Sequence, residues 1–266
     1  GYFFMSPTIF VLLLFILGPI LYAIFLSFHN VRLLGETSFE FVGLSNYERV
    51  FEDRRAGIAL WNTFKYVIIV VPCQTVLAIF LAATLNAGMK GEKIFRIIYF
   101  LPTLTSSAVL TLIFMWMYNR EGLVNFGLER LGLPTYNFLG DPDIALIAIM
   151  VMNIWATAPF FMVIYLAGLQ EIPDSLYEAA ELDGAGPIRK FWSITVPHLK
   201  PITSFVVIMS VIGTFQLFDQ SYIFSGGSGG PNNSTLTVVL LIYQYAFKTM
   251  NTMGYATAIA FMLAIV

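Results

Sequence analysis

The chain has 266 residues, of which 58% are hydrophobic and only 11% are charged, and its formal net charge is −2. A soluble domain carries roughly 25% charged residues, so this composition excludes an ordinary soluble enzyme, and the charge balance gives nucleic acid nothing to bind. The charges are also segregated, because no Asp, Glu, Lys or Arg occurs in 1–31, 66–89, 97–119, 144–170, 201–218 or 249–266. Since a helix satisfies its own backbone in lipid and spans it with about 20 apolar residues, we expect an all-α polytopic membrane protein.

Six apolar segments are predicted to span the membrane, and 1–266 is expected to form a single membrane domain. In chain order they cover roughly 5–27, 60–86, 95–118, 144–168, 201–223 and the chain from 253 onward. The first has internal prolines and no small-residue cleavage site, which favours a retained span over a signal peptide. The last apolar run, 256–266, rises only about 17 Å, too little to cross the hydrocarbon core. We therefore expect both ends to be trimmed and the sixth span to continue past Val266.

The connections between the spans contain no enzyme signature. The glycine-rich run 226–230 lacks the following Lys of a phosphate-binding loop, so we expect a flexible loop there and no ATP hydrolysis by this chain. The uncharged segment 236–247 predicts a short interfacial or re-entrant helix. Cys73 is the only cysteine, and His29 and His198 lack companions that could complete a metal site. We predict no catalytic residue and no metal site.

The polar connection 169–200, between the fourth and fifth spans, predicts a helical hairpin. Ser175-Leu-Tyr-Glu178 fits a capping box, in which two side chains satisfy free amides at a helix start. The helix is expected to run to about Asp183, and Gly184 can take the left-handed conformation that ends it. Gly186-Pro187 then begins a second helix, with proline at its first position.

The surface of this hairpin is built from very small side chains. Ala179, Ala180 and Gly184 allow a close approach of the backbone to another surface, while Glu178 and Asp183 supply charge for orientation. This pattern suits a helix that sits in a groove of a soluble partner. The alternative is an amphipathic helix that lies on lipid headgroups.

The same hairpin carries a family resemblance. Glu178-Ala179-Ala180, Asp183-Gly184 and the sequence Ile-Thr-Val-Pro at 194–197 together resemble the EAA loop of ABC-importer permeases. The family often has Leu where Val196 stands. The sequence Phe-Val-Gly-Leu-Ser-Asn-Tyr at 41–47 resembles the carbohydrate-type permeases in particular, such as the maltose, glycerol-phosphate and trehalose members. The resemblance covers nearly the whole chain.

The resemblance implies a role and a set of partners. In that family the EAA loop forms a cytoplasmic coupling helix, here with Glu178, Ala179, Ala180, Asp183 and Gly184, that docks into an ATP-binding cassette ATPase. It further implies an ATPase dimer, a second and different permease, an external solute-binding protein and a bacterial inner membrane. ATP and Mg would be bound by the ATPase, with no cofactor in this chain, and transport of a sugar would occur by alternating access.

Polar side chains on two otherwise apolar spans indicate a substrate path. Asn153, Thr157 and Phe160 share one helical face, as do Ser210, Thr214 and Leu217, with Gln216 nearby. Hydroxyls and amides suit a hydroxyl-rich ligand, and Phe160 or Trp155 could stack on a sugar ring. The alternative is that Ser and Thr hydrogen-bond between helices as packing contacts.

Asp219 is the only acid well inside the apolar pattern, and an ionisable residue there predicts a function. It could bind a substrate hydroxyl, pair with a base on a partner subunit, or simply be hydrated. The rival function is an ion- or proton-coupled secondary transporter, which typically shows internal repeats and several ionisable groups at mid-membrane. A third reading, a membrane scaffold without transport, would need no polar face on two spans.

Overall fold

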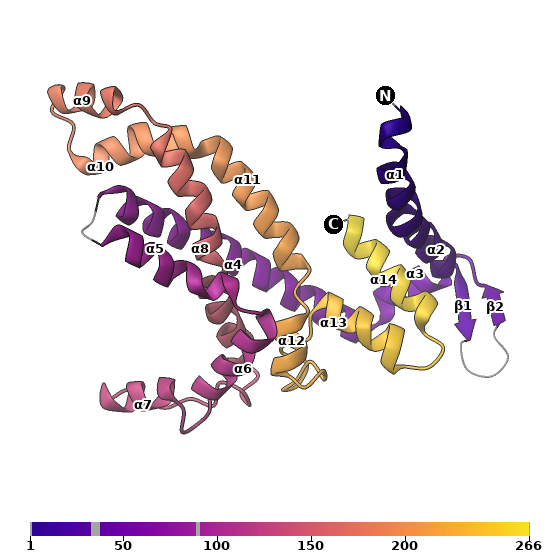
Figure 1. Cartoon of the computed structure of the whole chain (residues 1–266). Helices are drawn as coiled ribbons and strands as arrows, with labels where there is room; N and C mark the ends of the chain where they lie inside the picture. The colour runs from indigo at the N-terminus through magenta and orange to yellow at the C-terminus, as the bar shows by residue number, and fades with distance from the viewer. Residues whose placement is uncertain (1, 33–37, 89–90, 266) are drawn as a thin grey trace.

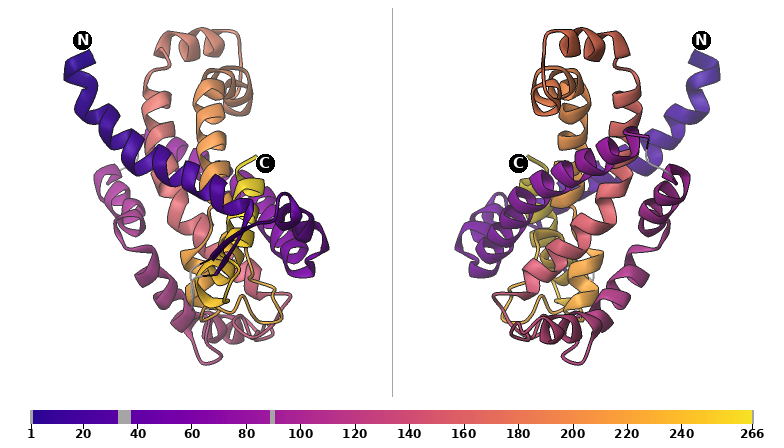
Figure 2. Two further views of the ribbon diagram at one scale, coloured as in Figure 1. Left: turned by 90° about the vertical axis from the view of Figure 1, so that its right-hand side faces the viewer. Right: turned by 90° about the vertical axis from the view of Figure 1, so that its left-hand side faces the viewer.

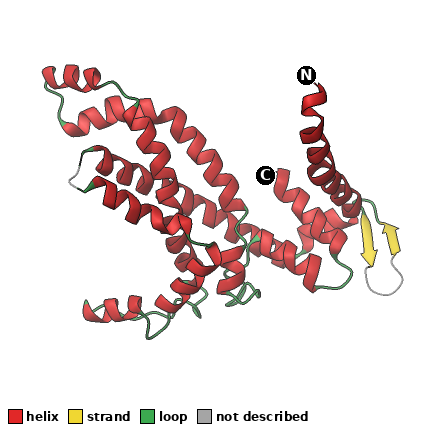
Figure 3. Ribbon diagram, in the orientation of Figure 1, coloured by secondary structure: helices red, strands yellow, loops and turns green. Residues whose placement is uncertain are grey.

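The computed structural model describes residues 2–32, 38–88 and 91–265. Within them, long helices dominate and one two-stranded antiparallel sheet stands at the edge (Figures 1 and 3). The elements are α1 (Tyr2–Leu12), η1 (Leu13–Leu17), α2 (Gly18–Ser27), β1 (His29–Arg32), β2 (Ser38–Phe41), α3 (Ser45–Glu52), α4 (Arg54–Asn86), α5 (Glu92–Phe100), η2 (Leu101–Leu104), α6 (Ser107–Met117), α7 (Leu123–Arg130), α8 (Ala145–Gln170), α9 (Asp174–Leu182), α10 (Pro187–Lys190), η3 (Phe191–Thr195), α11 (Val196–Phe215), α12 (Asp219–Phe224), α13 (Val238–Tyr243), η4 (Gln244–Lys248) and α14 (Met253–Ile265).

Four of the predicted spans are long apolar helices. By length and composition, the segments that can cross a membrane are Phe4–Ser27, Arg54–Asn86, Ala145–Gln170 and Pro187–Phe224. The predicted span over 95–118 is not one straight helix: Ile94–Leu104 and Ser107–Met117 are together long and apolar enough to cross a membrane, but they meet at a bend of 100°. Pro102 lies in a 3₁₀ turn and Thr105 is extended, so the helix hydrogen bonds stop between the two halves. The last apolar helix described, α14, has only 13 residues.

The core of the bundle lies where α4 packs against α8 and α11. Ala78 and Ala82 of α4 are fully buried against Ala158 and Met162 of α8 and Val206 of α11. Small residues let helix backbones approach closely in a membrane, so the three helices form one block. Figure 2 shows this block with the α9–α10 hairpin at one end and the turns around α7 at the opposite end.

The first span stands apart from the block (Figure 1) and is largely exposed in the isolated chain. Only its last turn packs, where α2 meets α14. Gly254 makes this contact possible, because a Cβ at that position would lie 1.9 Å from the main-chain oxygen of His29. No side chain fits there without moving the backbone.

Asp53 joins the start of α4 to the end of the chain. Its carboxylate accepts hydrogen bonds from the Tyr245 hydroxyl (2.7 Å), the Tyr255 hydroxyl (2.9 Å) and the main-chain N–H of Arg55 (2.8 Å). Burial alone would raise the pKa of Asp53, but these hydrogen bonds outweigh burial and the pKa is lowered. The ionised side chain therefore caps α4 and fixes η4 and α14 against it.

The hairpin confirms part of the local prediction and corrects the rest. Gly184 adopts φ +74°, and Gly186 and Pro187 start the second helix as expected. The capping box does not form, because α9 already begins at Asp174, after an extended Pro173, and no side chain caps it. The second helix is not separate from the fifth span. It runs through the π-helical η3 into α11, where Val196 N–H bonds to the Phe191 oxygen and the widened turn accommodates the following Pro197.

The glycine-rich loop is more tightly held than the sequence predicts. Asn62 of α4 donates from Nδ2 to the main-chain oxygens of Asn233 (2.8 Å) and Leu236 (3.0 Å). Gln244 Nε2 donates to the oxygen of Gly227 (2.8 Å). Side chains on two helices therefore order the loop, which sequence spacing could not reveal. The helix expected over 236–247 is present as α13 and η4.

Candidate substrate cavity and coupling hairpin

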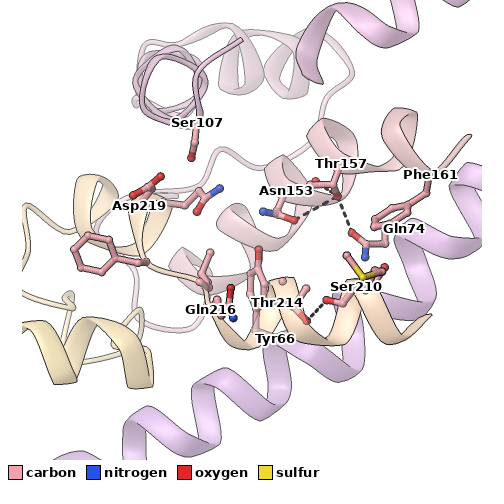
Figure 4. Close-up of a pocket in the computed structure, with 15 residues that line it drawn as sticks. Tyr66, Gln74, Ser107, Asn153, Thr157, Phe161, Ser210, Thr214, Gln216 and Asp219 are labelled. Atoms are coloured by element: carbon pink, nitrogen blue, oxygen red, sulfur yellow. Dashed lines mark hydrogen bonds between the residues drawn. The ribbon is translucent and has the colours of Figure 1, made fainter. Parts of the chain in front are cut away.

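A cavity of about 370 Å³ lies where α4, α8 and α11 meet the start of α12 (Figure 4). It contains six of the residues proposed from the sequence for a substrate path: Asn153, Thr157, Ser210, Thr214, Gln216 and Asp219. These residues come from three separate elements, so the fold gathers into one place what the sequence only placed on helix faces.

The structure adds α4 to the cavity, which the sequence reading missed. The Thr157 hydroxyl lies 2.6 Å from Gln74 Oε1 and 2.8 Å from the main-chain oxygen of Asn153. Gln74 is therefore the polar link between α4 and α8. A lone amide in the middle of an apolar span was the available signal, but its partner depends on how the helices pack.

Three hydroxyls of the lining have no hydrogen-bond partner: those of Tyr66, Ser107 and Ser210. Tyr66 is fully buried and Ser210 is 3% exposed. Leaving a buried polar group unpaired costs roughly 1–3 kcal/mol, so such groups call for an explanation. A ligand with hydroxyls of its own could supply the missing partners, since each hydroxyl both donates and accepts.

The two aromatic residues of the predicted path have different positions. Phe160 lines a neighbouring cavity of about 290 Å³ that also includes Asn153 and Thr157. Trp155 lines neither cavity and packs on Phe114, with ring centroids 5.5 Å apart. A path through the described cavities could thus use the ring of Phe160 but not that of Trp155.

Asp219 lies at a break in the fifth span. The helix α11 ends at Phe215, and α12 begins at Asp219 after the three non-helical residues 216–218. The predicted fifth span, 201–223, lies within the apolar segment Pro187–Phe224 and is interrupted at this break. Gln216 and Asp219 are both exposed in the isolated chain, at the open side of the cavity.

The coupling residues proposed from the sequence lie on an outward surface. The helix α9 buries none of its residues, and Glu178, Ala179, Asp183 and Gly184 are exposed, with Ala180 half-buried. Leu182, at the tip, is 91% exposed.

Two interactions brace the hairpin. Lys190 Nζ lies 2.8 Å from Glu181 Oε2, and this hydrogen bond and charge lower the pKa of the Glu181 carboxyl. The hydroxyls of Tyr177 and Thr195 lie 2.8 Å apart and tie α9 to the helix that continues as α11. These two contacts hold the exposed small side chains of α9 in a fixed position relative to the helix that continues as α11.

Comparison with known proteins decides the family. The family described as "binding-protein-dependent transport system inner membrane component" matches residues 74–266. The chain belongs to this family. The lactose transport system permease protein LacF of Rhizobium radiobacter is 36% identical over 268 residues, covering 100% of this chain and 89% of LacF. The trehalose/maltose permease protein MalF of Thermococcus litoralis is 36% identical over 247 residues, covering 92% of this chain and 82% of MalF.

A solved structure supports the fold. A chain in the crystal structure of a bacterial alginate ABC transporter, in complex with an alginate pentasaccharide-bound periplasmic protein, has a TM-score of 0.86 and 21% identity, covering 99% of this chain and 88% of that one. The predicted resemblance to carbohydrate-type ABC-importer permeases is confirmed. This permease is a multi-pass inner membrane protein, and the family is one of non-enzymatic membrane subunits.

Proposed function

We propose that this permease contributes the polar cavity at Asn153, Thr157, Ser210 and Thr214 as a sugar-contact region of the import pathway. The observation that carries the proposal is the group of polar side chains from α4, α8 and α11 that line one cavity inside an apolar bundle. The names of the relatives agree, since they specify lactose, trehalose or maltose, and arabinooligosaccharides. Which sugar is taken depends also on the external solute-binding protein.

We propose further that α9 is the coupling helix and faces the cytoplasm, with Glu178, Ala179, Ala180, Asp183 and Gly184 docked on an ATPase. Its exposed small-residue surface and the exposed Leu182 support this role. The complex would hold two ATPase copies, which bind ATP and Mg, and a second, different permease. Closure of the ATPase dimer by ATP would move α9, and the cavity would alternate between the two sides of the membrane, which requires different contacts in the two states.

A photo-crosslink tests the docking surface. A benzoylphenylalanine placed at Leu182 in the full complex should crosslink to the ATPase subunit. Leu131 is 76% exposed and directly follows α7, which lies at the opposite end of the bundle (Figure 1), so it provides the matched control. Crosslinking from position 131 but not 182 would reverse the orientation and overturn the assignment.

Transport by a cavity variant tests the pathway. Asn153→Ala removes a polar cavity side chain, whereas Val151→Ala alters an exposed residue of the same helix. In proteoliposomes with the binding protein, we expect uptake to fall for Asn153→Ala alone, with normal assembly and normal sugar affinity of the binding protein. An unchanged uptake rate would remove Asn153 from the pathway. Uptake that persists without ATP would instead favour a secondary transporter.

A further inference from the structure

The lining of the polar cavity has an uneven charge. Among its described residues, Asp219 carries the only carboxylate, and none is Lys, Arg or His. The rest of the polar lining consists of neutral hydroxyls and amides, such as those of Gln74, Asn153 and Gln216. The cavity therefore offers a sugar many neutral hydrogen-bonding groups and one fixed negative charge.

No basic side chain among the described residues lines the cavity or forms an ion pair with that carboxylate. The side-chain carboxylate of Asp219 has no hydrogen bond or ion pair with any described residue. The basic side chains near this end are engaged elsewhere: Lys248 lies over the rings of Tyr222 and Tyr243, and Arg55 donates to Gln244. An anion that enters the cavity would meet the carboxylate without compensation.

We infer that Asp219 is a specificity residue that excludes anionic sugars, so that the cavity takes an uncharged sugar unit. The inference rests on the proposed sugar-contact role of the cavity. The neutral amides and hydroxyls of the lining, such as those of Asn153 and Thr157, suit a neutral polyol, and the carboxylate repels a uronate of the same shape. Specificity by repulsion is efficient because it penalises the wrong ligand without requiring tighter contacts to the right one.

The size of the effect follows from Coulomb's law. Two like charges about 8–12 Å apart, at the effective dielectric constant of about 20 that suits protein sites, repel enough to weaken binding by roughly tenfold or more. Salt should reduce this discrimination, because the open side of the cavity lets ions screen the pair.

The experiment uses the complete complex in nanodiscs without the solute-binding protein, so that the cavity alone selects. Saturation-transfer NMR gives dissociation constants for the neutral probes lactose, arabinotriose and maltotriose and for the anionic probe trigalacturonate. Asp219→Asn should lower the dissociation constant of trigalacturonate about tenfold and should change the dissociation constant of whichever neutral probe binds by less than about threefold. Asp219→Glu should keep the discrimination. Asp143→Asn removes the same charge from an exposed site outside the cavity and should change neither.

Several outcomes would overturn the inference. Unchanged trigalacturonate binding in Asp219→Asn would show that the carboxylate does not select. A tenfold loss of neutral-probe binding would show that it holds a sugar hydroxyl instead, and loss of the second permease would show that it pairs with that subunit. If no neutral probe binds, or if Asn153→Ala leaves neutral binding intact, the sugar-contact proposal itself fails. If neutral probes bind in a way that depends on Asn153, but Asp219→Asn does not change trigalacturonate binding, only the role of Asp219 is refuted.

Discussion

Gly184→Arg separates folding of the hairpin from docking. Gly184 has φ +74°, and no atom lies within 4 Å of the position that a Cβ would occupy. A residue with a Cβ in this left-handed conformation costs roughly 1–2 kcal/mol, and the open space adds no clash. The Lys190–Glu181 and Tyr177–Thr195 contacts remain. The variant should therefore reach the membrane and keep its hairpin.

Gly184→Arg should weaken the association with the ATPase much more than it destabilises the fold. If α9 sits in a groove of the ATPase, an arginine at 184 overfills that groove, and overpacking costs roughly 1–3 kcal/mol. This corresponds to about 5- to 150-fold weaker association. Purification in mild detergent should recover the permease with less ATPase, and ATP-dependent uptake in proteoliposomes should fall with it.

Two control variants separate the surface from the backbone. Gly184→Asn keeps a small residue that tolerates the left-handed conformation, so it should retain most coupling. Gly88→Arg places the same side chain at another open position with φ +70°, just after α4 and outside the hairpin. Normal uptake with normal ATPase stoichiometry in Gly184→Arg would refute the docking argument, as would an equal loss in Gly88→Arg.

Two further predictions concern stability. The pKa of Asp53 is lowered in the folded protein, so the ionised carboxylate stabilises the fold above the pKa of an unfolded aspartate, and this stabilisation is lost as the pH falls through the folded pKa. The Tm of the wild type should therefore drop more steeply between about pH 5 and 2 than the Tm of Asp53→Asn. Parallel plots of Tm against pH for the two proteins would contradict this prediction. Gly254→Ala should abolish a stable complex or cost roughly 3 kcal/mol or more, because its Cβ meets the backbone of His29, whereas Gly57→Ala in open space should be nearly neutral in the same thermal assay.

The sequence predicted features that depend on a few neighbouring residues. The left-handed glycine at 184 and the proline at 187 obey local rules of helix ends, and both hold in the structure. The residues Asn153 and Thr157 are one helical turn apart, so their shared face followed from the period of the helix alone. Both do line the same cavity.

Features that depend on packing were missed. The link between Gln74 and Thr157 joins residues 83 positions apart, so no local pattern could pair them. The bend after Pro102 falls within an uncharged stretch, and composition alone predicts one span for such a stretch. The continuity of the second hairpin helix with the fifth span was likewise missed, because a π-helical turn carries the helix past Pro197.

The continuity of that helix connects the hairpin with the cavity. From Pro187 to Phe215 the chain is helical, about 43 Å at 1.5 Å per residue, with Ser210 and Thr214 near its far end. The hairpin is bonded to this helix at Thr195. A displacement of α9 would therefore be transmitted to the cavity wall by one continuous helix rather than by flexible loops.

The shared core determines what such a displacement can open. Because α4, α8 and α11 bury their small residues in one cluster, they should move together and keep the Gln74–Thr157 bond. The cavity must then change at its other borders. One border is the bent pair α5–α6, whose Ser107 lines the cavity at the start of α6. The other is the exposed side at Gln216 and Asp219, which this chain leaves uncovered and which a second permease would have to close.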